Sequence, residues 1–226
     1  REFGYPIEGD DIGECWGISA HPNGDGTVAS GAYKGMKLSE LWEKHPELFG
    51  DTGMDRFPLL VKIIDAKDDL SIQVHPDDAY AKAHENGSLG KTECWFILDC
   101  KENATLVVGH NAKTKEELEQ MIHEGRWKEF IREIPIKPGD FIQIDPGTVH
   151  AIKGGTLLLE TQQSSDITYR VYDYDRLSNG KPRQLHIVQS IDVITVPAKS
   201  ADNSVVHIEK KDDAIQQLIQ CPYYTV

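Results

Sequence analysis

The feature that most constrains the fold is a series of short apolar and β-branched runs separated by turn residues. Pairs such as Pro-Gly, Gly-Gly and Asn-Gly follow many of these runs, and such pairs are turn signals. Many short strands punctuated in this way are typical of a β-sandwich or barrel. The runs that we expect to be strands are 58–66, 71–75, 91–99, 104–110, 134–137, 141–144, 148–152, 156–162, 167–172, 186–194 and 205–208.

A small helical insertion is expected at about 111–133, where the β rhythm breaks. The segment 114–117 (TKEE) has the form of a capping box. Apolar residues then recur at helical spacing in 118–122 and again in 127–131. This stripe is typical of packing against a sheet, so the sequence predicts an all-β fold with a helical insertion.

Two further short helices are expected, one over 40–45 capped by Ser39 and one beginning at Pro76. No internal repeat or low-complexity linker divides the chain, and 226 residues are enough for one large β domain. Both ends look clipped, because the chain starts at Arg rather than Met and stops in an apolar run. We therefore expect one main domain over 1–220, with 221–226 as the start of a truncated C-terminal β region.

The composition limits the classes of partner. A formal charge of −13 argues against nucleic acid, whose phosphates need a basic surface, but allows a small anion held by a few convergent Lys and Arg side chains. No apolar run approaches the roughly 20 residues of a membrane helix. The four cysteines form no CxxC and no disulfide-framework spacing, so we expect a protein of the reducing cytosol.

Polar residues in and after the expected strands have the spacing of a metal site. Gln73 and His75 stand two apart in a strand, so their side chains project from the same face. Such a pair alone is more typical of an ordinary half-buried strand than of a metal site. However, Glu93 opens a later strand, and Gly139 lies eleven residues before His150. That order of residues is the cupin pattern, in which a small jelly-roll barrel holds a metal ion, with Gln73 in place of the usual His.

The chemistry of these four side chains is consistent with one metal ion. Two imidazoles, one carboxylate and one amide oxygen suit Zn²⁺ and tolerate other divalent ions. With a single carboxylate the site keeps a net positive charge, which favours an oxyanion over redox chemistry. An iron dioxygenase is disfavoured because Gln73 replaces a nitrogen ligand. The histidines that we interpret as non-ligands are His21, His45, His84, His110, His123, His186 and His207.

Several motifs in the same order resemble those of one family. They are 71–76 (SIQVHP), 91–95 (KTECW) and 146–151 (PGTVHA), together with 13–24 (GECW to HPNG) and 166–173 (DITYRVYD). Together they resemble the type I mannose-6-phosphate isomerases in their short bacterial form. The resemblance covers essentially the whole chain, and members of the family normally continue into a further β domain.

The resemblance implies a cupin-type jelly-roll barrel and one Zn²⁺ per chain, bound by Gln73, His75, Glu93 and His150. It also implies a reversible aldose–ketose isomerisation that interconverts mannose and fructose 6-phosphates through a cis-enediol. The substrate would then be a hexose 6-phosphate, and recognition of its phosphate would depend on local basic groups.

The resemblance further implies roles for four other side chains. Arg170 matches a catalytic arginine, Lys91 an active-site lysine, and Glu160 an acidic residue near the reacting carbons. Ser71 shares a strand face with two of the ligands and would contact the substrate. From the residues alone, Glu160 could equally be a surface carboxylate at a strand edge, Arg170 part of an ion pair, and Lys91 a solvated loop residue. A non-catalytic sugar-binding or regulatory cupin is the alternative to the enzyme.

Overall fold

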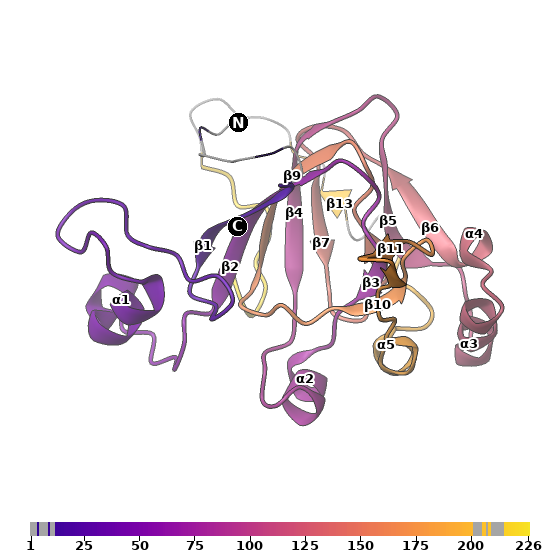
Figure 1. Cartoon of the computed structure of the whole chain (residues 1–226), viewed down its shortest axis with the longest axis horizontal. Helices are drawn as coiled ribbons and strands as arrows, with labels where there is room; N and C mark the ends of the chain where they lie inside the picture. Colours follow the sequence, from indigo (N-terminus) through magenta and orange to yellow (C-terminus); the bar gives the residue numbers. More distant parts are fainter. Residues whose placement is uncertain (1–3, 5–8, 10–11, 201–204, 207, 209–214) are drawn as a thin grey trace.

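Two antiparallel β-sheets form the body of the protein (Figure 1). The computed structural model describes residues 4, 9, 12–200, 205–206, 208 and 215–226. The larger sheet runs in the order β1-β2-β9-β4-β7-β13, with bounds β1 (Glu14–Ser19), β2 (Leu59–Ala66), β9 (Thr156–Gln163), β4 (Glu93–Cys100), β7 (Phe141–Ile144) and β13 (Val205–Val206).

The smaller sheet lies across from the larger one. Its order is β10-β3-β8-β5-β6, with bounds β10 (Tyr169–Tyr172), β3 (Ile72–Val74), β8 (His150–Ala151), β5 (Thr105–His110) and β6 (Ile131–Pro135). A separate hairpin pairs β11 (Leu177–Ser178) with β12 (Lys181–Pro182).

Apolar side chains from both sheets fill part of the space between them. The larger sheet contributes Trp95, Ile97 and Leu158, and the smaller one Leu106 and Val108, all fully buried. Burial of apolar surface is the dominant favourable contribution to folding, so this contact stabilises the packing of one sheet on the other. On the larger sheet, Glu93 and Glu160 stand two residues from Trp95 and Leu158, so the space between the sheets changes from an apolar core to a polar interior within one pleat repeat.

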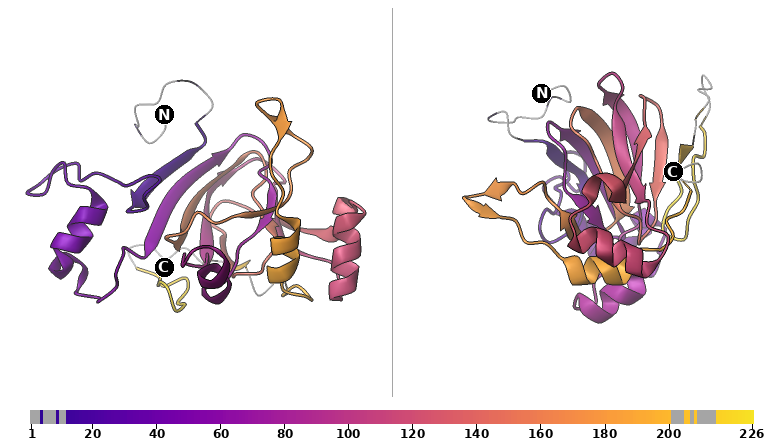
Figure 2. Two further views of the ribbon diagram at one scale, coloured as in Figure 1. Left: turned by 60° about the horizontal axis from the view of Figure 1, so that its bottom comes forward. Right: turned by 90° about the vertical axis from the view of Figure 1, so that its right-hand side faces the viewer.

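The helices lie around the sheets. In Figures 1 and 2, α2 and α5 lie at one end of the strands, while α1 lies on the opposite side of the protein from α3 and α4. Apolar residues of α3 and α5 cover the outer face of the smaller sheet. The bounds are α1 (Leu38–Lys44), a 3₁₀ turn η1 (Pro46–Phe49), α2 (Asp78–His84), α3 (Lys115–His123), α4 (Trp127–Phe130) and α5 (Ile187–Val193).

The all-β architecture and the helical insertion are confirmed, and one element was assigned wrongly. Residues 186–194, expected to be a strand, form α5. The β-branched residues there suggested a strand, but Ile187 and Ile191 lie one helical turn apart and both pack on the smaller sheet, while Val188 is exposed. Burial of one helical face therefore outweighs local β-propensity.

Smaller differences concern element ends. Lys37, rather than Ser39, occupies the N-cap of α1, and the Ser39 hydroxyl donates to Asp25 instead. Ile131 begins β6 rather than continuing a helix. The strands expected at 148–152 and 205–208 are shorter than predicted, and His207 lies outside the described residues. Strand β1 and the β11–β12 hairpin were not anticipated. Within the part of the chain that is described, no helix has the length and apolarity needed to cross a membrane.

Candidate metal centre and active-site cleft

Strand parity brings the predicted site residues into the space between the sheets. On β4, Glu93 lies two residues before the core residue Trp95, so both point inward. On β9, Glu160 follows Leu158 in the same way. On the opposite sheet, Ile72 and Val74 pack outward against the helices, which turns Gln73 inward. The polar end of the interior is therefore made by both sheets.

Three of the four predicted metal ligands form one buried cluster. The ligand atoms of His75, Glu93 and His150 lie within 4.8 Å of one another, and the residues are at most 1% exposed. His75 Nε2 lies 3.4 Å and His150 Nε2 3.3 Å from the two Glu93 oxygens. The fourth, Gln73, stands opposite His150 across β3 and β8, and its amide contacts His150 Nε2 at 3.2 Å. Rotation of this amide would exchange its nitrogen for the oxygen that a metal needs.

The charge states of this cluster match those of metal ligands. Burial lowers the pKa of His75 to about 3, and it also lowers the pKa of His150. Burial alone would raise the pKa of Glu93, but Lys91 and the two imidazoles outweigh it and hold that pKa well below its usual value. Neutral imidazoles and an ionised carboxylate are the forms that bind metals.

The donor set fits a divalent metal ion on a further observation. Glu93 is fully buried, and its only cationic contact among the described residues is Lys91 at Oε2, so Oε1 has neither a hydrogen-bond donor nor a lysine or arginine beside it. A buried carboxylate oxygen without a partner is costly, and a coordinated cation satisfies it. His150 Nδ1 contacts the Thr148 carbonyl at 2.9 Å, which places the proton on Nδ1 and leaves Nε2 free as a ligand atom.

Lys91 is buried beside the ligands rather than solvated. Its Nζ lies 2.8 Å from Glu93 Oε2 and 3.0 Å from His75 Nε2. The preceding residue, Gly90, passes so close to the turn before α2 that a Cβ would lie 2.4 Å from the Asp77 carbonyl carbon. Only glycine fits this approach, which fixes where Lys91 and Glu93 enter the interior.

Glu160 is also buried, which excludes the surface-carboxylate interpretation. It is 3% exposed and lies on β9, between β2 and β4. Trp95 Nε1 donates to its Oε1 at 3.1 Å, and Lys62 Nζ lies 3.3 Å from its Oε2. Burial and the nearby Glu93 carboxylate raise the pKa of Glu160, while Lys91 and Lys62 oppose them. A raised pKa makes this carboxylate a stronger proton acceptor.

Arg170 and Ser71 lie on the strands next to the ligands. Arg170 is paired with Gln73 across β10 and β3, so both side chains face the interior. Its Nη1 donates to the Gln184 carbonyl at 2.9 Å, and its buried Nε has no partner among the described residues. Ser71 is 5% exposed at the start of the same inward-facing row.

A large open cleft gives access to this interior. Its volume is about 1140 Å³, and Gln73, Lys91 and Glu160 are in its lining. Sequence reasoning missed other polar residues there, including the buried Lys62. Lys62 was detectable, because it is the one charge within the apolar run 59–64. The other missed polar and aromatic residues of this lining include Glu14, Trp16, Asp166, Asp173, Arg176 and Arg183.

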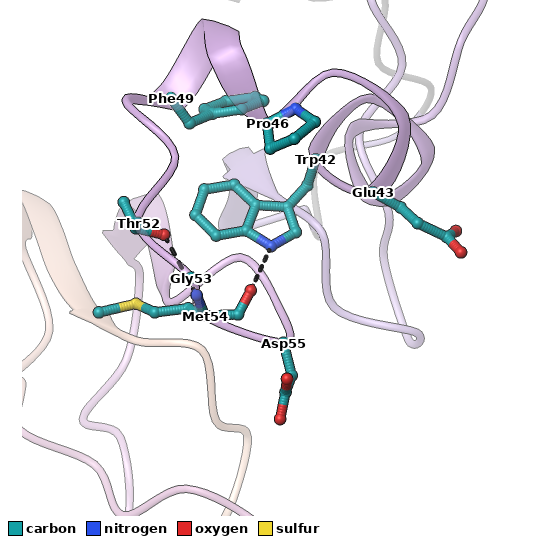
Figure 3. Close-up of a pocket in the computed structure, with 8 residues that line it drawn as sticks. All are labelled: Trp42, Glu43, Pro46, Phe49, Thr52, Gly53, Met54 and Asp55. Atoms are coloured by element: carbon teal, nitrogen blue, oxygen red, sulfur yellow. Dashed lines mark hydrogen bonds between the residues drawn. The ribbon is translucent and has the colours of Figure 1, made fainter.

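A second hollow, of about 230 Å³, lies beside α1 (Figure 3). Trp42 forms its wall and donates from Nε1 to the Met54 carbonyl at 3.2 Å. Trp42 also packs against Phe49 and Phe57. None of the predicted site residues lines this hollow, whereas Gln73, Lys91 and Glu160 line the large cleft.

Known proteins resemble this chain over its whole length. A model of the catalytic domain of type I phosphomannose isomerase matches residues 5–98. The chain is 55% identical to mannose-6-phosphate isomerase ManA of Bacillus subtilis over 100% of its own length and 72% of that protein. It is 52% identical to a mannose-6-phosphate isomerase of Streptococcus mutans, over 100% of this chain and 71% of that one. A crystal structure of the mannose 6-phosphate isomerase of Bacillus subtilis matches with a TM-score of 0.91 and 52% identity, covering 99% of this chain and 71% of that chain.

Proposed function

Because the chain belongs to the type I mannose-6-phosphate isomerases, it interconverts mannose 6-phosphate and fructose 6-phosphate, and we propose that it does so through a cis-enediol at the His75–Glu93–His150 cluster. The observation that carries this assignment is that Glu160, a separate buried carboxylate, lines one cleft with Gln73 and Lys91, which contact the buried metal-ligand cluster. A non-catalytic sugar-binding cupin is not favoured, since the similar proteins are isomerases.

We propose that the metal is one Zn²⁺ per chain, held by Gln73, His75, Glu93 and His150. Two neutral imidazoles and one carboxylate are a common zinc set, and the amide of Gln73 adds a neutral oxygen. When bound, this ion supplies Lewis-acid polarisation of the substrate oxygens next to the reacting carbons.

The proton transfer is assigned to Glu160. Isomerisation moves a proton between C2 and C1, so one base on one face of the substrate can remove it and return it. Glu93 is engaged by the imidazoles and Lys91, whereas Glu160 is held at its two oxygens by Trp95 and Lys62 without belonging to the cluster. Its raised pKa suits the acceptor role.

Lys91 and Arg170 stabilise the negative charge that develops on the substrate oxygens. Lys91 lies against Glu93, and Arg170 faces Gln73, so both cations are next to the reacting carbons. Fixed cations in a water-poor interior stabilise developing charge more than they would in bulk water. Ser71, in the same row as Gln73, is proposed to donate a hydrogen bond to a substrate hydroxyl.

The test is incubation with mannose 6-phosphate while fructose 6-phosphate is measured. We expect conversion that stops when a chelator removes the metal and returns when Zn²⁺ is restored. A protein that retains its fold and metal but forms no fructose 6-phosphate would contradict the proposal.

A further inference from the structure

We propose that Arg183, on the chain just after β12, binds the 6-phosphate of the substrate and thereby determines its specificity. This inference rests on the proposed function, because it assigns the far end of the same substrate. An open-chain hexose 6-phosphate has its phosphate at the opposite end from C1 and C2, so the cleft needs an anion site away from the metal ligands.

The wall of the cleft near the β11–β12 hairpin carries a cluster of arginines. Arg176 and Arg183 both contact the carboxylate of Asp173, which is 3% exposed. Arg170 lies three residues before Asp173 and donates to the carbonyl of Gln184, the neighbour of Arg183. Arg176, Arg183 and Asp173 line the cleft and carry a formal charge of +1, and Arg170 is close enough to interact electrostatically with all three.

The rest of the cleft lining has the opposite charge. Besides Asp173, Arg176 and Arg183, it contains three lysines and five carboxylates, which is a formal charge of −2. The charged residues in this remainder are Lys62, Lys67, Lys91, Glu14, Asp65, Asp68, Glu160 and Asp166. Since the whole chain carries −13, a phosphate gains no general attraction and must be bound by a local excess of positive charge.

Arg183 is the arginine of this cluster that is placed to bind a ligand. Its Nε donates to Asp173 Oδ2 at 2.6 Å and its Nη2 to the other carboxylate oxygen. This bidentate contact fixes the guanidinium plane, while Nη1 has no partner among the described residues, and 40% of the side chain is exposed in the cleft. In Arg176, by contrast, both terminal nitrogens already donate hydrogen bonds within the protein: Nη1 to the Asp69 carbonyl at 2.5 Å and Nη2 to the Asp173 carboxylate at 2.6 Å.

The separation from the metal ligands is compatible with one substrate. Arg176 ties the arginine cluster to Asp69, and Asp69 lies four residues before Gln73. Four residues span at most about 14 Å of chain. Gln73 and Arg183 line the same cleft, so one ligand in that cleft can contact both.

The experiment compares Arg183→Ala with Lys181→Ala. Lys181 is exposed on the same hairpin and does not line the cleft, so its loss removes an equal charge without the contact. Arg183→Ala leaves Asp173 paired with Arg176, so the buried carboxylate keeps a partner and the fold should survive. Steady-state kinetics with mannose 6-phosphate and competitive inhibition by inorganic phosphate are measured for both variants, with thermal unfolding as the check on folding.

For Arg183→Ala we expect KM and the inhibition constant of inorganic phosphate to rise together by about 10- to 100-fold, the cost of one charge-assisted contact. The kcat should change little, because the lost contact is made equally in the ground and transition states. Arg183→Lys should recover part of the phosphate affinity, and Lys181→Ala should match the parent. If both constants of Arg183→Ala stay at the parent values while the parent isomerises the substrate, this inference is wrong and the proposed function stands. If the parent itself does not isomerise mannose 6-phosphate, the proposed function is wrong.

Discussion

Replacing Glu160 with Gln tests the most specific step of the proposed mechanism. The substitution keeps the size and shape of the side chain and removes its ability to accept a proton. Trp95 Nε1, 3.1 Å from Oε1, can still donate to the amide oxygen of a glutamine. The variant should therefore fold and bind metal, since Glu160 contacts none of the proposed ligands directly.

The magnitude follows from what the side chain does in the structure. General-base catalysis is worth about 100- to 10,000-fold in rate, so turnover should fall by that factor. Stability should change less. Loss of one partner from a buried ion pair costs about 3–5 kcal/mol when the other charge is left alone. Lys62 keeps Glu14 at 3.0 Å, on the exposed side of the pair, so the loss should be below that range.

The assay combines turnover, metal content and exchange of the C2 proton with deuterium from solvent. Turnover and exchange should slow in parallel while metal content stays at the parent level. The matched control is Glu133→Gln. Glu133 lies on β6, outside the cleft lining, and its carboxylate is 2.8 Å from Lys153 Nζ, so this variant also loses an ion-paired carboxylate but should keep the parent turnover. Near-parent turnover in Glu160→Gln at full metal content would refute the role of this base and make Lys91 the leading candidate.

Three further predictions follow from the same geometry. His75→Ala and His150→Ala should each lose most of the bound metal by elemental analysis, and full retention in both would disprove the site. Free mannose should be a far poorer substrate than its 6-phosphate, and equal turnover of the two would exclude a phosphate-binding determinant. Burial lowers the pKa of His110, so below about pH 6.5 the unfolded chain takes up a proton that the folded protein does not. The free energy of unfolding should therefore fall by up to about 1.4 kcal/mol per pH unit on acidification. Urea titrations at several pH values should give a smaller pH dependence for His110→Gln than for the parent. Equal pH dependence in the two proteins would contradict this prediction.

The sequence predicted which side chains gather at the candidate metal centre because the pattern is local. Side chains two residues apart in a strand point to the same face. If 71–75 is a strand, Gln73 and His75 must therefore point together. Glu93 and His150 followed from spacing, and the fold places their ligand atoms with that of His75 within 4.8 Å. The position of Arg170 opposite Gln73 could not be predicted in this way. It depends on the pairing of β10 with β3, and local spacing in the sequence does not show which strands pair.

The arginine cluster was not predictable by this route. Arg176 and Arg183 flank a hairpin with exposed strands, and neither has an apolar periodicity that marks it as part of a site. What joins them is the carboxylate of Asp173, a contact across a loop. The misassigned α5 has a related cause, because the helix depends on a sheet face that is built from distant segments.

Trp95 shows why the core and the site cannot be separated in this fold. Its ring is fully buried in the apolar contact between the sheets, and its centroid lies 5.5 Å from that of the His150 ring in an edge-on arrangement. The indole Nε1 donates to Glu160. One side chain thus closes the core, packs against a proposed metal ligand and orients the proposed base. On β4 and β9 the core residues Trp95 and Leu158 are the next inward-facing residues to Glu93 and Glu160. The packing that stabilises the two sheets therefore also fixes the positions of these two carboxylates.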